Sequence, residues 1–377
     1  MLAALTLGIL ISRPQGVPWK EPFRLIEDLP TPAVIERVLG KESGAISIQG
    51  KVLTFAARSK ADGVRMTGGI QMPLKKLPGS DLWALQLEYD RWDRAVITYG
   101  FVDTWKDKIA NSNVRTRVYR GRHARPAPEM AEPLRGTLLK VSFPSRNLGT
   151  ERGVMVYLPP DCEKLRDLPA VFMADGQSTR DFAQVLEPLI REGRVRPTVI
   201  VGMYHGDYVG GFTDIEHYDA SKDLRFAEYI EGPYPERFDA HMKFVADELV
   251  PWAIAQFHVS PKAADHVIFG FSNGGAFAAA AAVLRPDVFQ KAFPFSMAIP
   301  PTDEPKARLG RFWFACGTLE SFEYLTDTFF AKAKGWGVRA TMDKWVGGHD
   351  SALWQGAFAK AIQEAFPAPR PTDFGIG

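Results

Sequence analysis

The chain has 377 residues, which is long for one domain and sufficient for two on a prior of about 100 to 200 residues per domain. Its hydrophobic (46%) and charged (24%) fractions are those of an ordinary globular protein, and a net charge of +2 gives no reason to expect a nucleic acid or a strongly acidic partner. The two cysteines, Cys162 and Cys316, form no disulfide framework, and no paired Cys/His spacing suggests structural zinc.

Residues 1–24 begin with an apolar run, Met1 to Ile11, that is too short to span a bilayer as a helix. No Lys/Arg-rich stretch precedes the run, and Ser12 to Gly16 contains no clean small-residue cleavage site. The run fits either the hydrophobic part of an export signal or an apolar strand or helix docked on the rest of the protein. The localisation is therefore open between export, for example to the periplasm, and the cytoplasm. No other stretch is long and apolar enough to be transmembrane.

Residues 25–122 are predicted to form a small β-sandwich of the immunoglobulin-like or carbohydrate-binding type. The pattern consists of short alternating segments separated by Gly, Pro and Asp, among them Val52 to Ala56, Gly63 to Met66 and Leu82 to Leu87. Residues 123–136 are polar and contain several prolines, which predicts a linker. Six basic residues span the end of the sandwich and the start of the linker, where they form either a solvated stretch or a site for an anionic ligand: Arg115, Arg117, Arg120, Arg122, His123 and Arg125.

Residues 137–377 are predicted to form an α/β domain whose mostly parallel sheet is covered by helices on both faces. Apolar strand-like runs alternate with helical patterns, of which Phe238 to Phe257 is the clearest. The strand candidates are Val154 to Leu158, Ala170 to Met173, Thr198 to Gly202, His266 to Phe269, Phe312 to Ala315 and Ala340 to Trp345.

The hexapeptide Gly270 to Gly275, Gly-Phe-Ser-Asn-Gly-Gly, matches the G-x-S-x-G nucleophile elbow. The run Val267 to Phe269 before it is β-branched and aromatic, as a buried parallel strand requires, and the alanine-rich run Ala276 to Leu284 after it favours a helix. The flanking glycines relieve crowding at a turn that holds the serine in a strained conformation. The motif predicts a hydrolase with Ser272 as its nucleophile.

A serine hydroxyl needs a base within hydrogen-bond reach and an acid that orients the base. Among the seven histidines, His349 fits best because it follows the last strand candidate, in the chain order serine, acid, histidine. Asp350, which adjoins it, is expected to stabilise the histidine loop. His205 follows a strand end, but it precedes Ser272 and is a weaker candidate for the base.

Glu320 is the predicted acid, because the apolar strand Phe312 to Cys316 breaks at a glycine and places Glu320 in the following loop. Glu323 and Asp343 remain alternative acids. The competing interpretation of Glu320 is that it only caps the next helix.

Two backbone amides are expected to stabilise the oxyanion of a tetrahedral intermediate. One is the amide of Asn273, the residue after the nucleophile, at the amino end of a helix. The second is expected in the loop after an early strand, where Met173 to Gln177 stands, and we assign it to the amide of Gln177. A plain turn is the alternative for this segment.

Together these motifs resemble the esterase branch of the α/β-hydrolases, which includes enterochelin (enterobactin) esterase, feruloyl esterases and acetylxylan esterases. The resemblance rests on an opening strand at Val156 to Pro160, an oxyanion loop at Ala174 to Gln177 and the elbow at Gly270 to Gly275. Leu224 to Ile230 with Asp247 to Pro251 is similar to a paired signature of bacterial esterases. Gly317 to Glu320 resembles the acid loop, and Gly348 to Asp350 resembles the histidine loop. A β-sandwich before such a hydrolase is similar to enterochelin esterase and to some polysaccharide esterases with a carbohydrate-binding-type module.

The resemblance implies a serine carboxylic-ester hydrolase that works through an acyl-enzyme, with a triad of Ser272, His349 and Glu320 and no metal or organic cofactor. The expected substrate is a small-molecule or glycan ester, left open among a siderophore lactone, a feruloyl or acetyl polysaccharide ester and a small metabolite. An acyltransferase of the same fold and a non-catalytic glycan-binding protein are the alternative functions. No nucleic acid partner or integral membrane segment is expected, and the oligomeric state is open.

Five residues near the strand ends are candidates for lining a substrate pocket, although aromatic residues in such loops often serve only in packing: Tyr204, His205, Tyr208, Tyr324 and Trp354.

Overall fold

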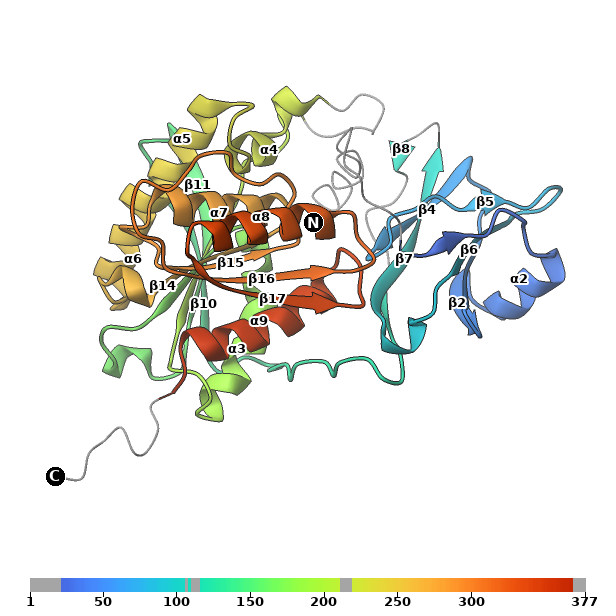
Figure 1. Ribbon diagram of the computed structural model, residues 1–377, viewed down its shortest axis with the longest axis horizontal. Helices are drawn as coiled ribbons and strands as arrows, with labels where there is room; N and C mark the ends of the chain where they lie inside the picture. Colours follow the sequence, from blue (N-terminus) through green and yellow to red (C-terminus); the bar gives the residue numbers. More distant parts are fainter. Residues whose placement is uncertain (1–21, 106–107, 110–115, 211–218, 369–377) are drawn as a thin grey trace.

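The computed structural model describes residues 22–105, 108–109, 116–210 and 219–368. Figure 1 shows the amino-terminal strands at one end of the molecule and a sheet flanked by helices at the other. The apolar run predicted as an export signal or a docked segment lies outside the described residues.

Two antiparallel sheets form the amino-terminal part, which confirms the predicted β-sandwich. One sheet holds β1 (Arg24–Leu25), β2 (Gly44–Gln49), β3 (Val52–Arg58), β5 (Lys75–Lys76) and β6 (Leu82–Glu88); the other holds β4 (Gly63–Gly68), β7 (Val96–Trp105), β8 (Lys108–Ile109) and β9 (Arg117–Arg120). Alternate side chains of both sheets share one apolar core, because successive residues of a strand point to opposite faces. Helix α2 (Pro32–Leu39) packs Ile35 and Leu39 against a second cluster, and a single turn, η1 (Trp92–Arg94), precedes β7.

The carboxyl-terminal part contains a sheet of eight strands in the order β10-β11-β13-β12-β14-β15-β16-β17. Its strands are β10 (Thr137–Ser145), β11 (Thr150–Leu158), β12 (Ala170–Met173), β13 (Val199–Met203), β14 (His266–Phe271), β15 (Lys291–Phe295), β16 (Arg311–Gly317) and β17 (Arg339–Trp345). The β10–β11 and β11–β13 pairs are antiparallel, and the other neighbours are parallel. The predicted mostly parallel sheet is confirmed, with β10 and β15 as strands that the sequence pattern missed.

Helices cover both faces of this sheet (Figure 1). They are α3 (Thr179–Arg191), α4 (Leu224–Tyr229), α5 (Pro235–Lys243), the π-helical turn η5 (Phe244–Leu249), α6 (Val250–Phe257), α7 (Asn273–Leu284), α8 (Phe322–Gly335) and α9 (Ser351–Ala365), with single turns η2 (Cys162–Lys164), η3 (Gly176–Ser178), η4 (Ala220–Lys222) and η6 (Ala263–Asp265). One apolar cluster includes side chains of α5, α6, α7 and α8, and another those of α3 and α9. The helix predicted over Phe238 to Phe257 is thus two α-helices joined by η5.

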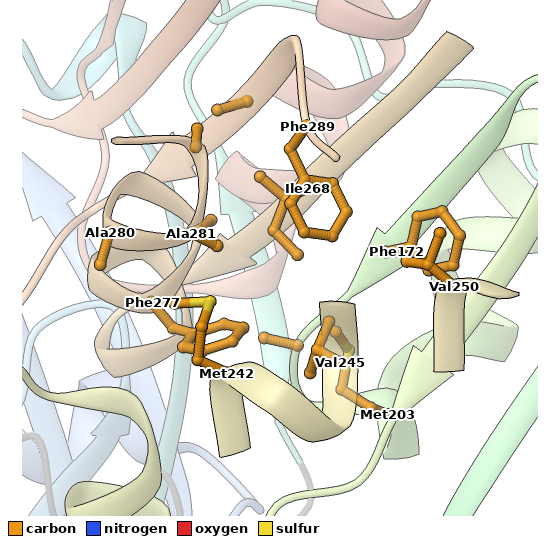
Figure 2. Packing of buried hydrophobic residues seen from close by; sticks show 14 of the residues in the cluster. Phe172, Met203, Met242, Val245, Val250, Ile268, Phe277, Ala280, Ala281 and Phe289 are labelled. Atoms are coloured by element: carbon orange, nitrogen blue, oxygen red, sulfur yellow. The ribbon is translucent and has the colours of Figure 1, made fainter. Parts of the chain in front are cut away.

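Helix α7 consists mostly of glycine and alanine, which lets it pack close to the sheet. Figure 2 shows Phe277, Ala280 and Ala281 of α7 in one buried cluster with Ile268 of β14 and Phe172 of β12. Full burial of a phenylalanine or isoleucine side chain contributes about 1.5–3 kcal/mol. The cluster therefore fixes the helix that starts directly after Ser272.

The segment 123–136, predicted as a linker, is held against α3 by hydrogen bonds. The Ala131 N–H donates to the Gln184 carbonyl at 2.8 Å. The N–H groups of Arg135 and Gly136 donate to the carboxylate of Glu187 at 2.8 and 2.7 Å, and this carboxylate is fully buried. The connection between the two parts is therefore docked along its second half.

Candidate active site

Ser272 stands at the turn between β14 and α7, at the carboxyl edge of the parallel strands. Its φ is 59° and its ψ −127°, a positive-φ conformation that strains a residue with a side chain by about 1–3 kcal/mol. Two glycines make the turn possible, because a Cβ on Gly270 would collide with the Gly274 carbonyl and a Cβ on Gly275 with the Phe295 carbonyl. This geometry has the form of a nucleophile elbow.

His349 and Glu320 meet where the loops after β17 and β16 come together. A hydrogen bond joins His349 Nδ1 to Glu320 Oε2, and both side chains are buried. When a carboxylate accepts from Nδ1–H, Nε2 is the ring nitrogen left to accept a proton. The other oxygen, Glu320 Oε1, accepts hydrogen bonds from the Gly317 N–H at 2.7 Å and from the Ser296 hydroxyl at 2.6 Å.

The two alternative carboxylates contact other groups. Glu323 accepts a hydrogen bond from Lys344 Nζ at 3.0 Å, and Asp343 accepts one from the Arg125 guanidinium at 2.7 Å. Of the three candidates, Glu320 is the one that contacts the histidine.

Aromatic rings hold the imidazole of His349 from two directions. Phe322 stacks on it with ring centres 4.2 Å apart, and Trp354 meets it edge-on at 4.9 Å. The indole N–H of Trp354 donates to the Ser296 hydroxyl at 2.8 Å, and this hydroxyl donates to Glu320. The histidine, the carboxylate and the tryptophan therefore form one connected network.

The two amides assigned to an oxyanion hole lie in the first turns of helices. Asn273 opens α7, and Gln177 lies in η3, where Asp175 starts the turn at φ 56°. The first N–H groups of a helix have no intrahelical acceptor and are available to a bound anion. A Cβ on Gly176 would collide with the Gly202 carbonyl, so only glycine allows this loop to pass so close to β13.

The loop that carries Gln177 is anchored to α4 by an ion pair. The Arg225 guanidinium donates to both oxygens of Asp175, at 2.7 and 2.8 Å, and both side chains are buried. Burial alone would raise the pKa of Asp175, but the adjacent guanidinium outweighs it and holds the pKa below its ordinary value. The Asp175 N–H also donates to the Tyr229 hydroxyl at 2.9 Å.

A cavity of about 540 Å³, within the range of small-molecule sites, is lined by several of the predicted residues, while Glu320 and Asn273, both in the described part of the chain, are not among its lining residues. Ser272, His349 and Gln177 line it, as do three of the five pocket candidates, Tyr204, His205 and Trp354.

Tyr208 and Tyr324 are not among the described residues that line this cavity. The Tyr208 hydroxyl accepts a hydrogen bond from the Asp219 N–H at 2.8 Å, and Tyr324 belongs to α8.

Sequence reasoning missed one wall of the cavity, which comes from the sandwich. Its residues are Thr67, Gly68, Thr98 and Thr116. Threonines in β-strands with an alternating pattern give no local sign of a binding site, because their place in the cavity depends on how the sandwich packs against the α/β part. Ser296 was missed for the same reason, whereas Arg225 lies in the paired esterase signature, Leu224 to Ile230 with Asp247 to Pro251.

Among the residues that the structure describes, no three or more His, Cys, Asp or Glu side chains are grouped as metal ligands. Within the same residues, no helix has the length and apolar character needed to cross a membrane.

The eight-stranded sheet, the helices on its two faces and the strained serine turn define an α/β-hydrolase fold, here preceded by a β-sandwich. Residues 145–364, more than half of the chain, match the family described as "Putative esterase". The chain belongs to this esterase family, as the motif resemblance predicted.

Solved structures show the same fold at low sequence identity. The enterochelin esterase of Shigella flexneri superposes with a TM-score of 0.63 at 15% identity, covering 86% of this chain and 96% of its own. The ferric enterobactin esterase of Salmonella typhimurium gives a TM-score of 0.60 at 15% identity, covering 92% and 96%. A ferulic acid esterase gives 0.50 at 16% identity, covering 62% of this chain and 98% of its own.

A curated relative, the uncharacterized protein YjcH of Bacillus subtilis, is 24% identical over 160 residues. The match covers 42% of this chain and 60% of the relative's length.

Proposed function

We propose that the protein is a serine carboxylic-ester hydrolase that works through an acyl-enzyme, with Ser272 as nucleophile, His349 as base and Glu320 as the orienting acid. The observation that carries the proposal is the hydrogen bond between His349 Nδ1 and Glu320 Oε2, beside a cavity that Ser272 also lines. Membership of the esterase family supports the same reaction class.

The reaction begins when Ser272 Oγ attacks the ester carbonyl carbon while His349 Nε2 takes the hydroxyl proton. The carbonyl oxygen becomes an oxyanion, which the N–H groups of Asn273 and Gln177 stabilise; one such donor is worth about 3 kcal/mol in the transition state. The bond to the leaving oxygen then breaks, and the alcohol takes the proton from His349. Water repeats the sequence on the acyl-enzyme and releases the acid.

Ser272→Ala tests the proposal directly. We expect the variant to lose at least about 10³-fold in kcat on an activated short-chain ester, because no other group forms the acyl bond. A fluorophosphonate probe should label the wild type and not the variant, and circular dichroism should show the same fold. Near-normal turnover in Ser272→Ala would contradict the mechanism, and so would a wild type that stays unlabelled.

The ester itself is identified by a substrate screen. Enterochelin and enterobactin esterases are among the structures that cover 86% of this chain, one of them solved in the presence of enterobactin, and a ferulic acid esterase covers 62%. We therefore propose siderophore lactones as the first class to assay, followed by feruloyl and acetyl polysaccharide esters and by small-metabolite esters. Hydrolysis of an ester is assigned to this site only where the Ser272→Ala variant no longer hydrolyses that ester.

A further inference from the structure

The histidine loop, residues 346–350, is hydrogen-bonded to the sandwich through its backbone. The Val96 N–H of β7 donates to the Val346 carbonyl at 2.8 Å. The N–H of His349 itself donates to the carbonyl of Gly69, the residue after β4, at 2.9 Å. The backbone of the proposed base is therefore held by a part of the molecule that lies some 280 residues earlier in the chain.

Asp350 divides its carboxylate between the two parts. Oδ2 accepts a hydrogen bond from the Thr98 N–H of β7 at 3.1 Å. Oδ1 caps α9 by accepting from the N–H groups of Ala352 and Leu353 at 2.9 and 3.3 Å. The residue is only 1% exposed, so water competes little for these bonds.

Apolar contacts join the same two parts. Leu319, directly before Glu320, and Val346, three residues before His349, are 3% and 9% exposed. Both belong to the apolar cluster of the sandwich. The acid loop and the histidine loop therefore each insert one side chain into the sandwich core.

Two glycines permit this close approach. A Cβ on Gly348 would collide with the Gly69 carbonyl, and a Cβ on Gly69 would collide with Asp350 Oδ2. Gly69 does not have a positive φ, so its role is to leave space rather than to form a turn.

We propose that the sandwich positions the base of the catalytic site, and that Asp350 is the positioning residue through which it does so. The role of His349 in this proposal rests on the proposed function. A displacement of about 1 Å at a reacting group can cost about 100-fold in rate, so a loop held from outside its own fold makes catalysis depend on that contact. The sandwich then contributes to turnover as well as to stability.

Asp350→Asn separates the two roles of the carboxylate. Asparagine caps a helix as well as aspartate does, so its carbonyl oxygen keeps the cap of α9. Its amide NH₂ then faces the Thr98 N–H, which places two donors opposite each other. The concentration of active sites is measured by titration with the fluorophosphonate probe, and kcat is calculated per active site. We expect this kcat to fall at least about tenfold, while KM for a small activated ester changes less than about threefold.

Gly69→Ala perturbs the same contact from the sandwich side and keeps the charge of Asp350. We expect the same loss of kcat at nearly constant KM, because the added methyl group displaces Asp350 Oδ2. Gly50→Ala is the matched control: its φ of 59° strains an alanine, and an added Cβ there meets no atom within 4 Å. This control weakens the sandwich without touching the histidine loop and should leave kcat unchanged.

Hydrogen exchange of residues 346–353 gives a readout that does not depend on turnover. Exchange should rise in Asp350→Asn and Gly69→Ala and stay at the wild-type level in Gly50→Ala. Normal kcat with unchanged exchange in the first two variants overturns the proposal, and so does an equal loss of kcat in Gly50→Ala. A wild type that neither turns over esters nor reacts with the probe contradicts the proposed function instead, while a rise in exchange still supports the positioning of the loop.

Discussion

Glu320 uses its two carboxylate oxygens for different purposes. One oxygen accepts from the ring nitrogen of His349, and the other accepts from a backbone N–H and from the Ser296 hydroxyl. The second set of bonds fixes the carboxylate plane, so the imidazole that it holds has one orientation. In the mechanism proposed above, this orientation fixes the tautomer in which Nδ1 carries the proton and Nε2 can accept one.

Replacement of Glu320 by glutamine should therefore lower kcat by about 100-fold or more, because an amide cannot stabilise the imidazolium that forms in the reaction. Glu323→Gln is the matched control, since Glu323 contacts Lys344 and not the histidine, and it should keep full activity. Steady-state kinetics on one activated ester measure both variants. An active Glu320→Gln beside an inactive Glu323→Gln would assign the acid to the other residue.

His241 shows how burial acts on a titratable group whose nearest carboxylate oxygen, Glu228 Oε2, lies 3.7 Å from Nδ1 without forming a hydrogen bond. It is fully buried among the rings of Tyr229, Phe244 and Phe277, and neither of its ring nitrogens has a hydrogen-bond partner within the described part of the chain. Burial lowers the pKa of His241 to about 4, against an ordinary value of 6.5. The ring is therefore neutral in the folded protein near neutral pH.

A pH dependence of stability follows from this shift. Between pH 6.5 and about 4 the unfolded chain binds a proton at His241 that the folded protein does not, so stability is lost as pH falls through this window. The loss is up to about 1.4 kcal/mol per pH unit. His241→Phe should flatten the decline of the free energy of unfolding, measured by urea denaturation across the window. Parallel curves for wild type and variant would contradict the assignment.

At the scale of elements, helix α4 stabilises the loop between β12 and α3. Its residue Arg225 forms the buried pair with Asp175, whose backbone starts the turn that carries Gln177. The helix has six residues and is too short to be stable alone, so its position depends on such tertiary contacts. The ion pair links an element without catalytic groups to the proposed oxyanion hole.

Arg225→Gln should lower the free energy of unfolding by about 3–5 kcal/mol, because it leaves the Asp175 carboxylate buried without its counter-charge. The double variant Asp175→Asn, Arg225→Gln should recover part of this loss, since no uncompensated charge then remains. Urea denaturation of the wild type, both single variants and the double variant measures the coupling. Strictly additive losses would show that the pair does not act as a unit.

Two strands escaped prediction for physical reasons that their residues show. In β15, Lys291–Phe295, Pro294 lacks an N–H and normally argues against a central strand. The structure tolerates it because the register between β15 and β16 skips Phe293 and Pro294. β10 lies at the sheet edge with many exposed residues, so it lacks the continuous apolar pattern of a buried parallel strand.

At the scale of the whole molecule, the sandwich and the α/β part share a core. Leu319 and Val346 lie in the apolar cluster of the sandwich, and the segment 123–136 is docked on α3. The boundaries at residues 25–122, 123–136 and 137–377 remain a prediction. We propose that the two parts unfold together, because separating them would expose these apolar side chains and the buried hydrogen bonds of Asp350.

Leu53→Ala tests this cooperativity. Leu53 is fully buried in the sandwich, and its truncation should cost about 2–5 kcal/mol. We expect a single thermal transition that moves to lower temperature in calorimetry, with loss of esterase activity in the same transition. A variant that melts in two steps and keeps its activity after the first would show that the parts are independent.

Local sequence patterns determined much of the fold and most of the candidate catalytic residues of this protein. Short runs of consecutive residues predict the elbow around Ser272, the alternation of strands and helices, and the loops that carry Glu320 and His349. They can do so because backbone strain and strand periodicity are local properties. Only the tertiary structure decided that Ser296 and Trp354 are linked by hydrogen bonds to Glu320 of the proposed triad, and that Arg225 pairs with Asp175 beside the proposed oxyanion loop. It also decided that the sandwich supplies one wall of the cavity and a hydrogen bond to Asp350. Those contacts join residues far apart in the chain, and their partners are chosen by the packing of whole sheets and helices rather than by any neighbour in the sequence.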